Sequence, residues 1–182
     1  MVFSQRTYER VVLEDPDGQW ELHRGRLREK PGGTARHNRV MLWLAAQILE
    51  QVDPANFDVR CNGGRARRAD ETSYIPDVMV IPTSLVRPFL ERWDVLEVYD
   101  ASLPFVAEVW SPSTGAYDID AKLPEYQRRG DAEIWRVHPF DRTVTTWRRR
   151  PDGAYDEEVY RGGMVDLFVL PGVHIDLDAL FG

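Results

Sequence analysis

Two short apolar runs constrain this chain most, because each fits a buried strand and each contains one acidic residue. The first is Ile75-Pro76-Asp77-Val78-Met79-Val80-Ile81, and the second is Phe105-Val106-Ala107-Glu108-Val109. Apolar runs of this length, closed by turn residues such as proline, are typical of buried strands. A carboxylate in such a run is costly to bury unless a metal ion, a cation or a shared proton compensates it. We therefore expect Asp77 and Glu108 to mark the functional site.

Lysine is rare in this chain: of its 23 basic residues, two are lysines, Lys30 and Lys122. Against a bias towards arginine, a lysine needs a reason of its own. Lys122 has one, since it follows Glu108 by fourteen residues and is expected on the next helix. Lys30 is assigned no such reason. The alternative for Lys122 is a helix-surface pair with Asp118, a contact worth only ~0.2–0.5 kcal/mol.

Length and composition favour a single domain over residues 1–182, with a sizeable core. No apolar run approaches the ~18 residues of a membrane helix, and residues 1–10 lack the apolar centre of a secretory signal. Cys61 is the single cysteine, so an intramolecular disulfide is excluded and we expect a reduced, cytoplasmic location. The net charge of −7 argues against whole-surface attraction to nucleic acid. It remains compatible with a local basic groove, or with an acidic site that a divalent ion neutralises.

The pattern of elements predicts a mixed α/β domain. Helices are expected from Thr7 to about Leu13, from a Thr34 cap to the Asp53-Pro54 stop, and from about Ile119 to Arg129. Strands are expected at residues 20–23, 27–29, 57–61, 78–81 and 103–110, followed by a hairpin of residues 134–137 and 143–148.

Asp77 and Glu108 come from different predicted strands, so their side chains could converge at one end of a sheet. Magnesium binds through one or two carboxylates together with waters and substrate phosphates. The carbonyl of Val109 could add a further oxygen ligand. Lys122 could then orient the attacking water, or offset charge that develops on a phosphoryl oxygen. These residues predict metal-assisted hydrolysis of a phosphodiester.

The same residues carry a family resemblance. Three stretches carry it: Pro76-Asp77, then Glu108-Val109-Trp110-Ser111-Pro112-Ser113-Thr114, then Asp118 with Lys122 and Tyr126. Together they resemble the Uma2 family of restriction-endonuclease-like proteins, a branch of the PD-(D/E)xK nuclease superfamily. The resemblance covers nearly the whole chain. It implies a restriction-endonuclease-like mixed sheet flanked by helices, Mg²⁺ or Mn²⁺ as the cofactor, and DNA as the substrate. Nucleases of this fold commonly act as dimers, so it also implies a candidate homodimer, which the sequence itself does not show.

By this resemblance, Asp77 and Glu108 are the metal-binding carboxylates and Lys122 is the catalytic lysine. In the wider superfamily the lysine lies two residues after the acid, where this chain has Trp110, so Lys122 is expected to reach the site from the following helix. Glu21 and His37 match positions that are often acidic or polar in the family, and they are expected to flank the site. Pro124 lies two residues after Lys122, where a proline removes a hydrogen bond from a helix interior. The residue at which that helix starts, and therefore how far Lys122 reaches, is left open.

Two other functions remain alternatives. The first is a catalytically silent binding or regulatory module that keeps the nuclease fold. The second is a hydrolase of a non-nucleic substrate, with Glu108 and Asp77 as an acid/base pair. That hydrolase would keep its activity in the presence of a chelator.

Overall fold

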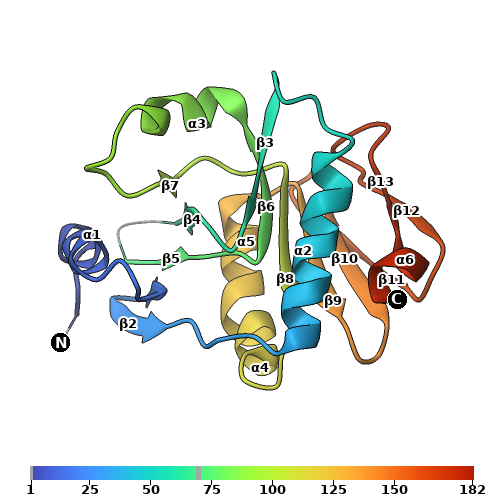
Figure 1. Ribbon diagram of the computed structural model, residues 1–182, viewed down its shortest axis with the longest axis horizontal. Helices are drawn as coiled ribbons and strands as arrows, with labels where there is room; N and C mark the ends of the chain where they lie inside the picture. The colour runs from blue at the N-terminus through green and yellow to red at the C-terminus, as the bar shows by residue number, and fades with distance from the viewer. Residues whose placement is uncertain (1, 69–70) are drawn as a thin grey trace.

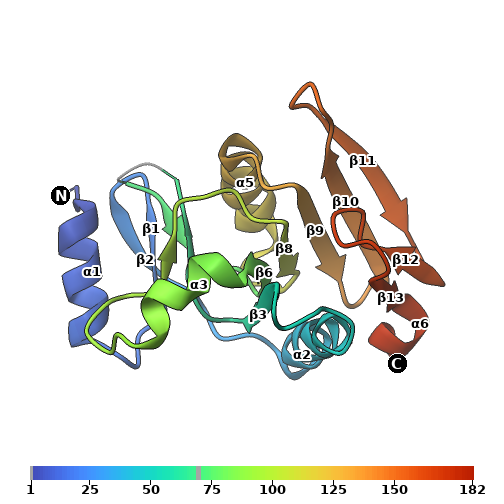
Figure 2. The ribbon, with the colours of Figure 1, turned by 90° about the horizontal axis from the view of Figure 1, so that it is seen from above.

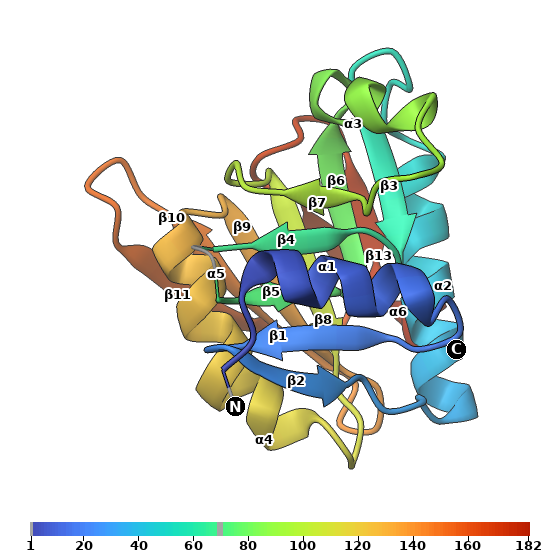
Figure 3. The same cartoon turned by 90° about the vertical axis from the view of Figure 1, so that its left-hand side faces the viewer.

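Two β-sheets form the framework of the computed structural model, which describes residues 2–68 and 71–182. Residues 1, 69 and 70 of the predicted 1–182 domain lie outside the described residues. The large sheet has six strands in the order β11 (Tyr155–Tyr160), β10 (Thr143–Arg149), β9 (Glu133–His138), β8 (Phe105–Val109), β6 (Val78–Pro82) and β3 (Phe57–Cys61). The small sheet has five, in the order β2 (Arg26–Glu29), β1 (Trp20–His23), β5 (Ser73–Tyr74), β4 (Arg65–Arg67) and β7 (Val98–Tyr99). Figure 3 shows the strands of the small sheet running across the direction of β3 and β6.

Both faces of the large sheet are covered, as expected for its apolar central strands. Helix α2 (Ala35–Leu49) lies on one face, and α5 (Leu123–Arg129) lies on the opposite face (Figures 1 and 2). Along β6, Val78 and Val80 pack into the core on the α2 side, whereas Met79 and Ile81 pack into the core on the α5 side. The strand pairs of the large sheet are antiparallel except β8 with β9, so this sheet is mixed.

Further elements complete the two layers. The ribbon of β12 (Met164–Asp166) and β13 (His174–Asp176) and the last helix α6 (Leu177–Phe181) add buried side chains to the α2-side core. Helix α3 (Thr83–Leu90) adds Val86 to the opposite core. Helix α1 (Gln5–Glu14) packs Tyr8 and Val12 against Leu22 of the small sheet, in a separate small core.

The caps of the first two helices differ in how well the sequence predicted them. Thr34 caps α2 as expected, because its Oγ1 accepts the N–H of His37 at 3.2 Å. The expected cap at Thr7 is wrong. Helix α1 begins after Ser4, whose Oγ accepts the N–H of Thr7 at 3.3 Å. Thr7 therefore occupies the third helical position, which an N-cap side chain normally bonds.

The helix after Glu108 begins earlier than expected and contains a wider turn. It consists of α4 (Gly115–Tyr117), a π-helical segment (Asp118–Lys122) and α5. The N–H of Leu123 closes the wide turn on the carbonyl of Asp118, directly before Pro124, whose nitrogen cannot donate a hydrogen bond. Gly130 ends the helix in the left-handed conformation, with φ of 80°. The π-helical segment thus accommodates Pro124 within the helix that carries Lys122.

Most of the elements that the sequence did not predict are short or irregular, and the six-residue strand β11 is the exception. Strands β5 and β7 have two residues each, too few to show a periodic pattern, and α3 contains Pro88. Within the described residues, no helix combines the length and the apolar character needed to cross a membrane.

Candidate functional site

The predicted acids meet at the seam between the two sheets. Asp77 directly precedes β6, and Glu108 is the fourth residue of β8, the neighbouring strand. Glu108 alternates with Val109, which packs into the α2-side core, so its side chain points towards α5 and the small sheet. Both carboxylates are buried, with exposed fractions of 1% for Asp77 and 5% for Glu108.

Asp77 is held by three donors from different parts of the chain. The ammonium of Lys30, which follows β2, lies 2.7 Å from Oδ1. On Oδ2, the carboxylate contacts Nε2 of His37 at 3.1 Å and accepts the backbone N–H of Val109 at 2.7 Å. Val109 therefore meets Asp77 through its N–H, whereas its predicted role as a carbonyl ligand of a metal stays a prediction.

Glu108 forms the other half of the site. Its Oε1 accepts from Nζ of Lys122 at 3.1 Å and from the hydroxyl of Tyr126 at 2.6 Å. The same ammonium lies 2.9 Å from Oε1 of Glu21 in β1, and 3.8 Å from Oδ1 of Asp118. Lys122 is 1% exposed, so the helix-surface pair with Asp118 does not describe it. Lys122 instead joins three buried carboxylates.

Burial and the neighbouring charges shift the pKa values in opposite directions. Burial raises the pKa of Glu108 to about 8, although the charge of Lys122 opposes the shift. Burial would also raise the pKa of Asp77, but the ammonium of Lys30 and the hydrogen bond from His37 outweigh it and hold that pKa well below its usual range. Burial lowers the pKa of Lys122, and the charges of Glu108, Glu21 and Asp118 more than reverse this effect. Asp77 is thus kept ionised and Lys122 charged.

The site contains more acidic than basic groups. The carboxylates of Glu21, Asp77, Glu108 and Asp118 face the ammonium groups of two lysines and the imidazole of His37, an excess of two negative charges when the four acids are ionised and His37 is neutral. Burial raises the pKa of Asp118, and its Oδ1 has no hydrogen-bond partner among the described residues. A divalent cation would compensate this charge, so the donor chemistry fits the Mg²⁺ or Mn²⁺ that the sequence predicts.

Two carboxylate oxygens retain acceptor capacity for such an ion. Oδ1 of Asp77 accepts from Lys30 alone, and no hydrogen-bond donor in the described part of the chain reaches Oε2 of Glu108. The described residues contain no group of three or more His, Cys, Asp or Glu side chains arranged to hold a metal ion. Magnesium does not require such a group, because it keeps several waters and binds through one or two carboxylates.

A model of the Uma2 family, described as "Putative restriction endonuclease", matches residues 6–178. The chain belongs to the Uma2 family. Among solved structures, it is similar to a putative nuclease belonging to DUF820 from Anabaena variabilis, with a TM-score of 0.73 and 19% identity over 89% of each chain. At that identity the likeness shows the nuclease-like fold alone, and it confirms the predicted fold class. No curated protein matches the chain.

The cluster around Asp77 and Glu108 contains every residue that the sequence selected. Glu21 and His37, which were expected at its flanks, contact Lys122 and Asp77 directly. Lys30, to which the sequence assigned no reason of its own, also lies in this cluster, because its ammonium is 2.7 Å from Asp77. The rarity of lysine was the signal that could have found it, since both lysines of this Uma2 chain lie in the site.

Trp110 directly follows β8, at the position where the resemblance places the lysine of the wider superfamily. Its ring stacks on His138 with centroids 4.3 Å apart. A Cβ on Gly115 would lie 2.0 Å from the indole nitrogen, so the indole needs a glycine beside it. The helix carrying Lys122 begins at this glycine, so Trp110 packs against the element that supplies the lysine.

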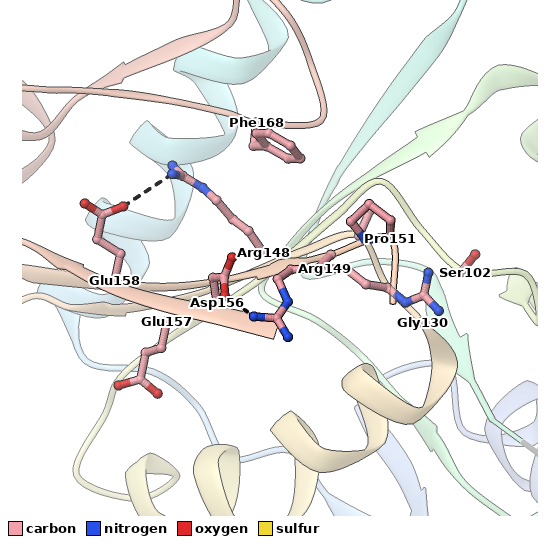
Figure 4. Close-up of a pocket in the computed structure, with 11 residues that line it drawn as sticks. Ser102, Gly130, Arg148, Arg149, Pro151, Asp156, Glu157, Glu158 and Phe168 are labelled. Atoms are coloured by element: carbon pink, nitrogen blue, oxygen red, sulfur yellow. Dashed lines mark hydrogen bonds and ion pairs between the residues drawn. The ribbon is translucent and has the colours of Figure 1, made fainter. Parts of the chain in front are cut away.

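A large cavity lies away from these residues, between β10, β11 and the loop containing Phe168 (Figure 4). Its volume is about 1110 Å³, and none of the residues that line it belongs to the site. Two of its three arginines face acids: Arg148 lies 3.5 Å from Glu158, and Arg150 lies 3.2 Å from Asp156. Because only Arg149 remains without an acidic partner among the described residues, the cavity is a poor candidate for binding phosphate.

Proposed function

We propose that this Uma2 protein is a Mg²⁺-dependent endonuclease, or one that uses Mn²⁺, and that it hydrolyses DNA phosphodiester bonds. The observation that carries the proposal is the convergence of both lysines with buried acids from two neighbouring strands. Membership of a restriction-endonuclease family and the nuclease-like fold support it. Burial of charge at this density is costly for stability, which favours a functional reason for the cluster.

In this proposal, Asp77 and Glu108 would hold the cation, with the Val109 carbonyl as a further candidate ligand. The bound cation would polarise the scissile phosphate and lower the pKa of a bound water. Lys30 and His37 keep Asp77 ionised and fixed in direction. Lys122, anchored by Glu21 and Glu108, orients the water or offsets the charge on a phosphoryl oxygen.

The decisive experiment is a nuclease assay with Mg²⁺ or Mn²⁺ on linear, supercoiled and single-stranded DNA, with RNA as a comparison. We expect cleavage by the wild type, and a loss of at least about 100-fold for Glu108→Ala and Lys122→Ala. Asp120→Ala is the matched control, because Asp120 is an exposed acid in the same π-helical segment. Equal cleavage by the wild type and both site variants would show that a contaminant is responsible.

A silent binding or regulatory protein of the same fold is the second candidate. The feature that favours it is the complete set of protein partners around Asp77, which Lys30, His37 and Val109 already neutralise and orient. Calorimetric titration of Mg²⁺ or Mn²⁺ into the wild type and Asp77→Ala separates the candidates. The nuclease requires weaker binding by Asp77→Ala, whereas equal binding would remove the proposed metal site.

A metal-free hydrolase with Glu108 and Asp77 as an acid/base pair would use their opposed pKa shifts. A chelator distinguishes it from the proposed nuclease. The nuclease loses activity in excess EDTA and regains it with added Mg²⁺, whereas the acid/base enzyme would be unaffected.

A further inference from the structure

The outer face of α2 carries apolar side chains that nothing in the described structure covers. Leu42, Trp43 and Leu49 are 61%, 50% and 59% exposed, and the partly buried Ala46 lies between them. Their spacing places them on the side of the helix opposite Leu44 and Ile48, which are fully buried. Figures 1 and 2 show α2 at the outside of the molecule, with its outer side free of other drawn segments. We call Leu42, Trp43, Ala46 and Leu49 the α2 outer face.

The charges at the two ends of this face are opposite to those that the helix dipole favours. Arg39 lies near the N-terminal end and Glu50 caps the C-terminal end; both are exposed. A helix dipole favours acids near its first turn and bases near its last turn, and α2 has neither. In the described part of the chain, neither Arg39 nor Glu50 forms an ion pair, and the Arg39 guanidinium lies beside Gly182. No acidic or basic side chain of the described residues therefore pairs with either charge.

The two end charges are complementary between two copies of α2 that run antiparallel. Arg39 and Glu50 are equally distant along the helix from the midpoint between Trp43 and Ala46, about 8 Å on either side. An antiparallel second copy that places Trp43 over Ala46 therefore brings Arg39 against Glu50 of the other copy, twice. Ala46 is small enough to admit the indole, and antiparallel packing also opposes the two helix dipoles favourably.

We propose that the α2 outer face binds a second copy of this chain, as an antiparallel helix pair around a two-fold axis. The contact is isologous, since the same residues face one another from both copies. A single helix pair is small compared with the ≈ 1,200–2,000 Å² of a stable interface, so the dimer is weak and depends on concentration. This inference does not depend on the proposed nuclease activity.

Sedimentation equilibrium over about 1–100 µM protein tests the proposal. We expect the wild type to shift from monomer to dimer within this range, and Trp43→Glu to weaken the dimer at least about 10-fold. Trp93→Glu is the matched control, because Trp93 is 94% exposed and lies outside α2, and it should dimerise like the wild type. Both variants replace an exposed tryptophan, so circular dichroism should show native folding for each.

A charge exchange tests the antiparallel register. Arg39→Glu and Glu50→Arg should each weaken the dimer several-fold, and the double variant should restore it, because misfolding cannot produce such a rescue. A wild type that stays monomeric throughout overturns the proposal, as does normal dimerisation of Trp43→Glu. A double variant as weak as the single variants also overturns it. If the wild type is monomeric and Trp43→Glu weakens its binding to DNA, the face belongs to DNA binding, which would likewise contradict the proposal.

Discussion

Replacing Lys30 by methionine should strongly destabilise the folded protein. The Lys30 ammonium donates three hydrogen bonds, to Oδ1 of Asp77 at 2.7 Å, to Oδ1 of Asn62 at 2.7 Å and to the carbonyl of Ile75 at 2.8 Å. Methionine fills a similar volume but leaves these acceptors without their donor. Removing one partner of a buried ion pair costs roughly 3–5 kcal/mol. Because Asp77 keeps its contacts with His37 and Val109, we expect the low end, about 3 kcal/mol.

Urea denaturation in excess EDTA measures this loss. Arg10→Met is the matched control, since Arg10 is 70% exposed in a 4.0 Å pair with Glu14, and it should change the free energy of unfolding by less than about 0.5 kcal/mol. The double variant Lys30→Met/Asp77→Asn should be at least about 1 kcal/mol more stable than the sum of the two single losses predicts. A Lys30→Met variant within about 0.5 kcal/mol of the wild type would refute the reasoning.

Three further predictions concern other contacts. Burial lowers the pKa of His37, but the hydrogen bond and charge of Asp77 outweigh it and raise that pKa above its ordinary 6.5. The stabilisation that His37 provides should therefore be full below about pH 6.5 and lost as the pH rises through the pKa of His37 in the folded protein. Urea melts of the wild type and His37→Gln in EDTA should therefore converge at high pH, and a constant difference would contradict this. Tyr126→Phe removes the 2.6 Å hydrogen bond to Glu108 and should cost about 1–2 kcal/mol in urea denaturation, whereas no loss would mean that water replaces the hydroxyl. Gly130→Ala should cost about 1 kcal/mol in the same assay because φ is 80°, and an unchanged midpoint would show that the turn relaxes.

The two acids and Lys122 could be found from the sequence because each conflicts with its local surroundings. An acid within an apolar strand and a rare lysine on the next helix are visible without coordinates. Their roles as metal ligands and catalytic lysine stay predictions, as does the single domain over residues 1–182. Family membership and the fold class are confirmed by the family match and the related structure.

The rarity of lysine marks Lys30 as unusual, but nothing in its local sequence places it near Asp77. It follows an edge strand of the small sheet, and its approach to Asp77 depends on how that sheet packs across the large one. Pattern rules describe neighbours within an element, and they carry little information about the docking of two sheets. The π-helical segment was also missed, since its single wide turn leaves no periodic signal.

The placement of Glu21 and Lys30 on and beside the β1–β2 hairpin has a consequence for local unfolding. If the hairpin separated from the large sheet, Lys122 would lose Glu21 and Asp77 would lose Lys30 together. The remaining buried charges would lack their partners, which adds to the cost of exposing the small core around Leu22. We therefore expect the small sheet to separate from the large sheet as one unit, rather than by fraying of the hairpin alone.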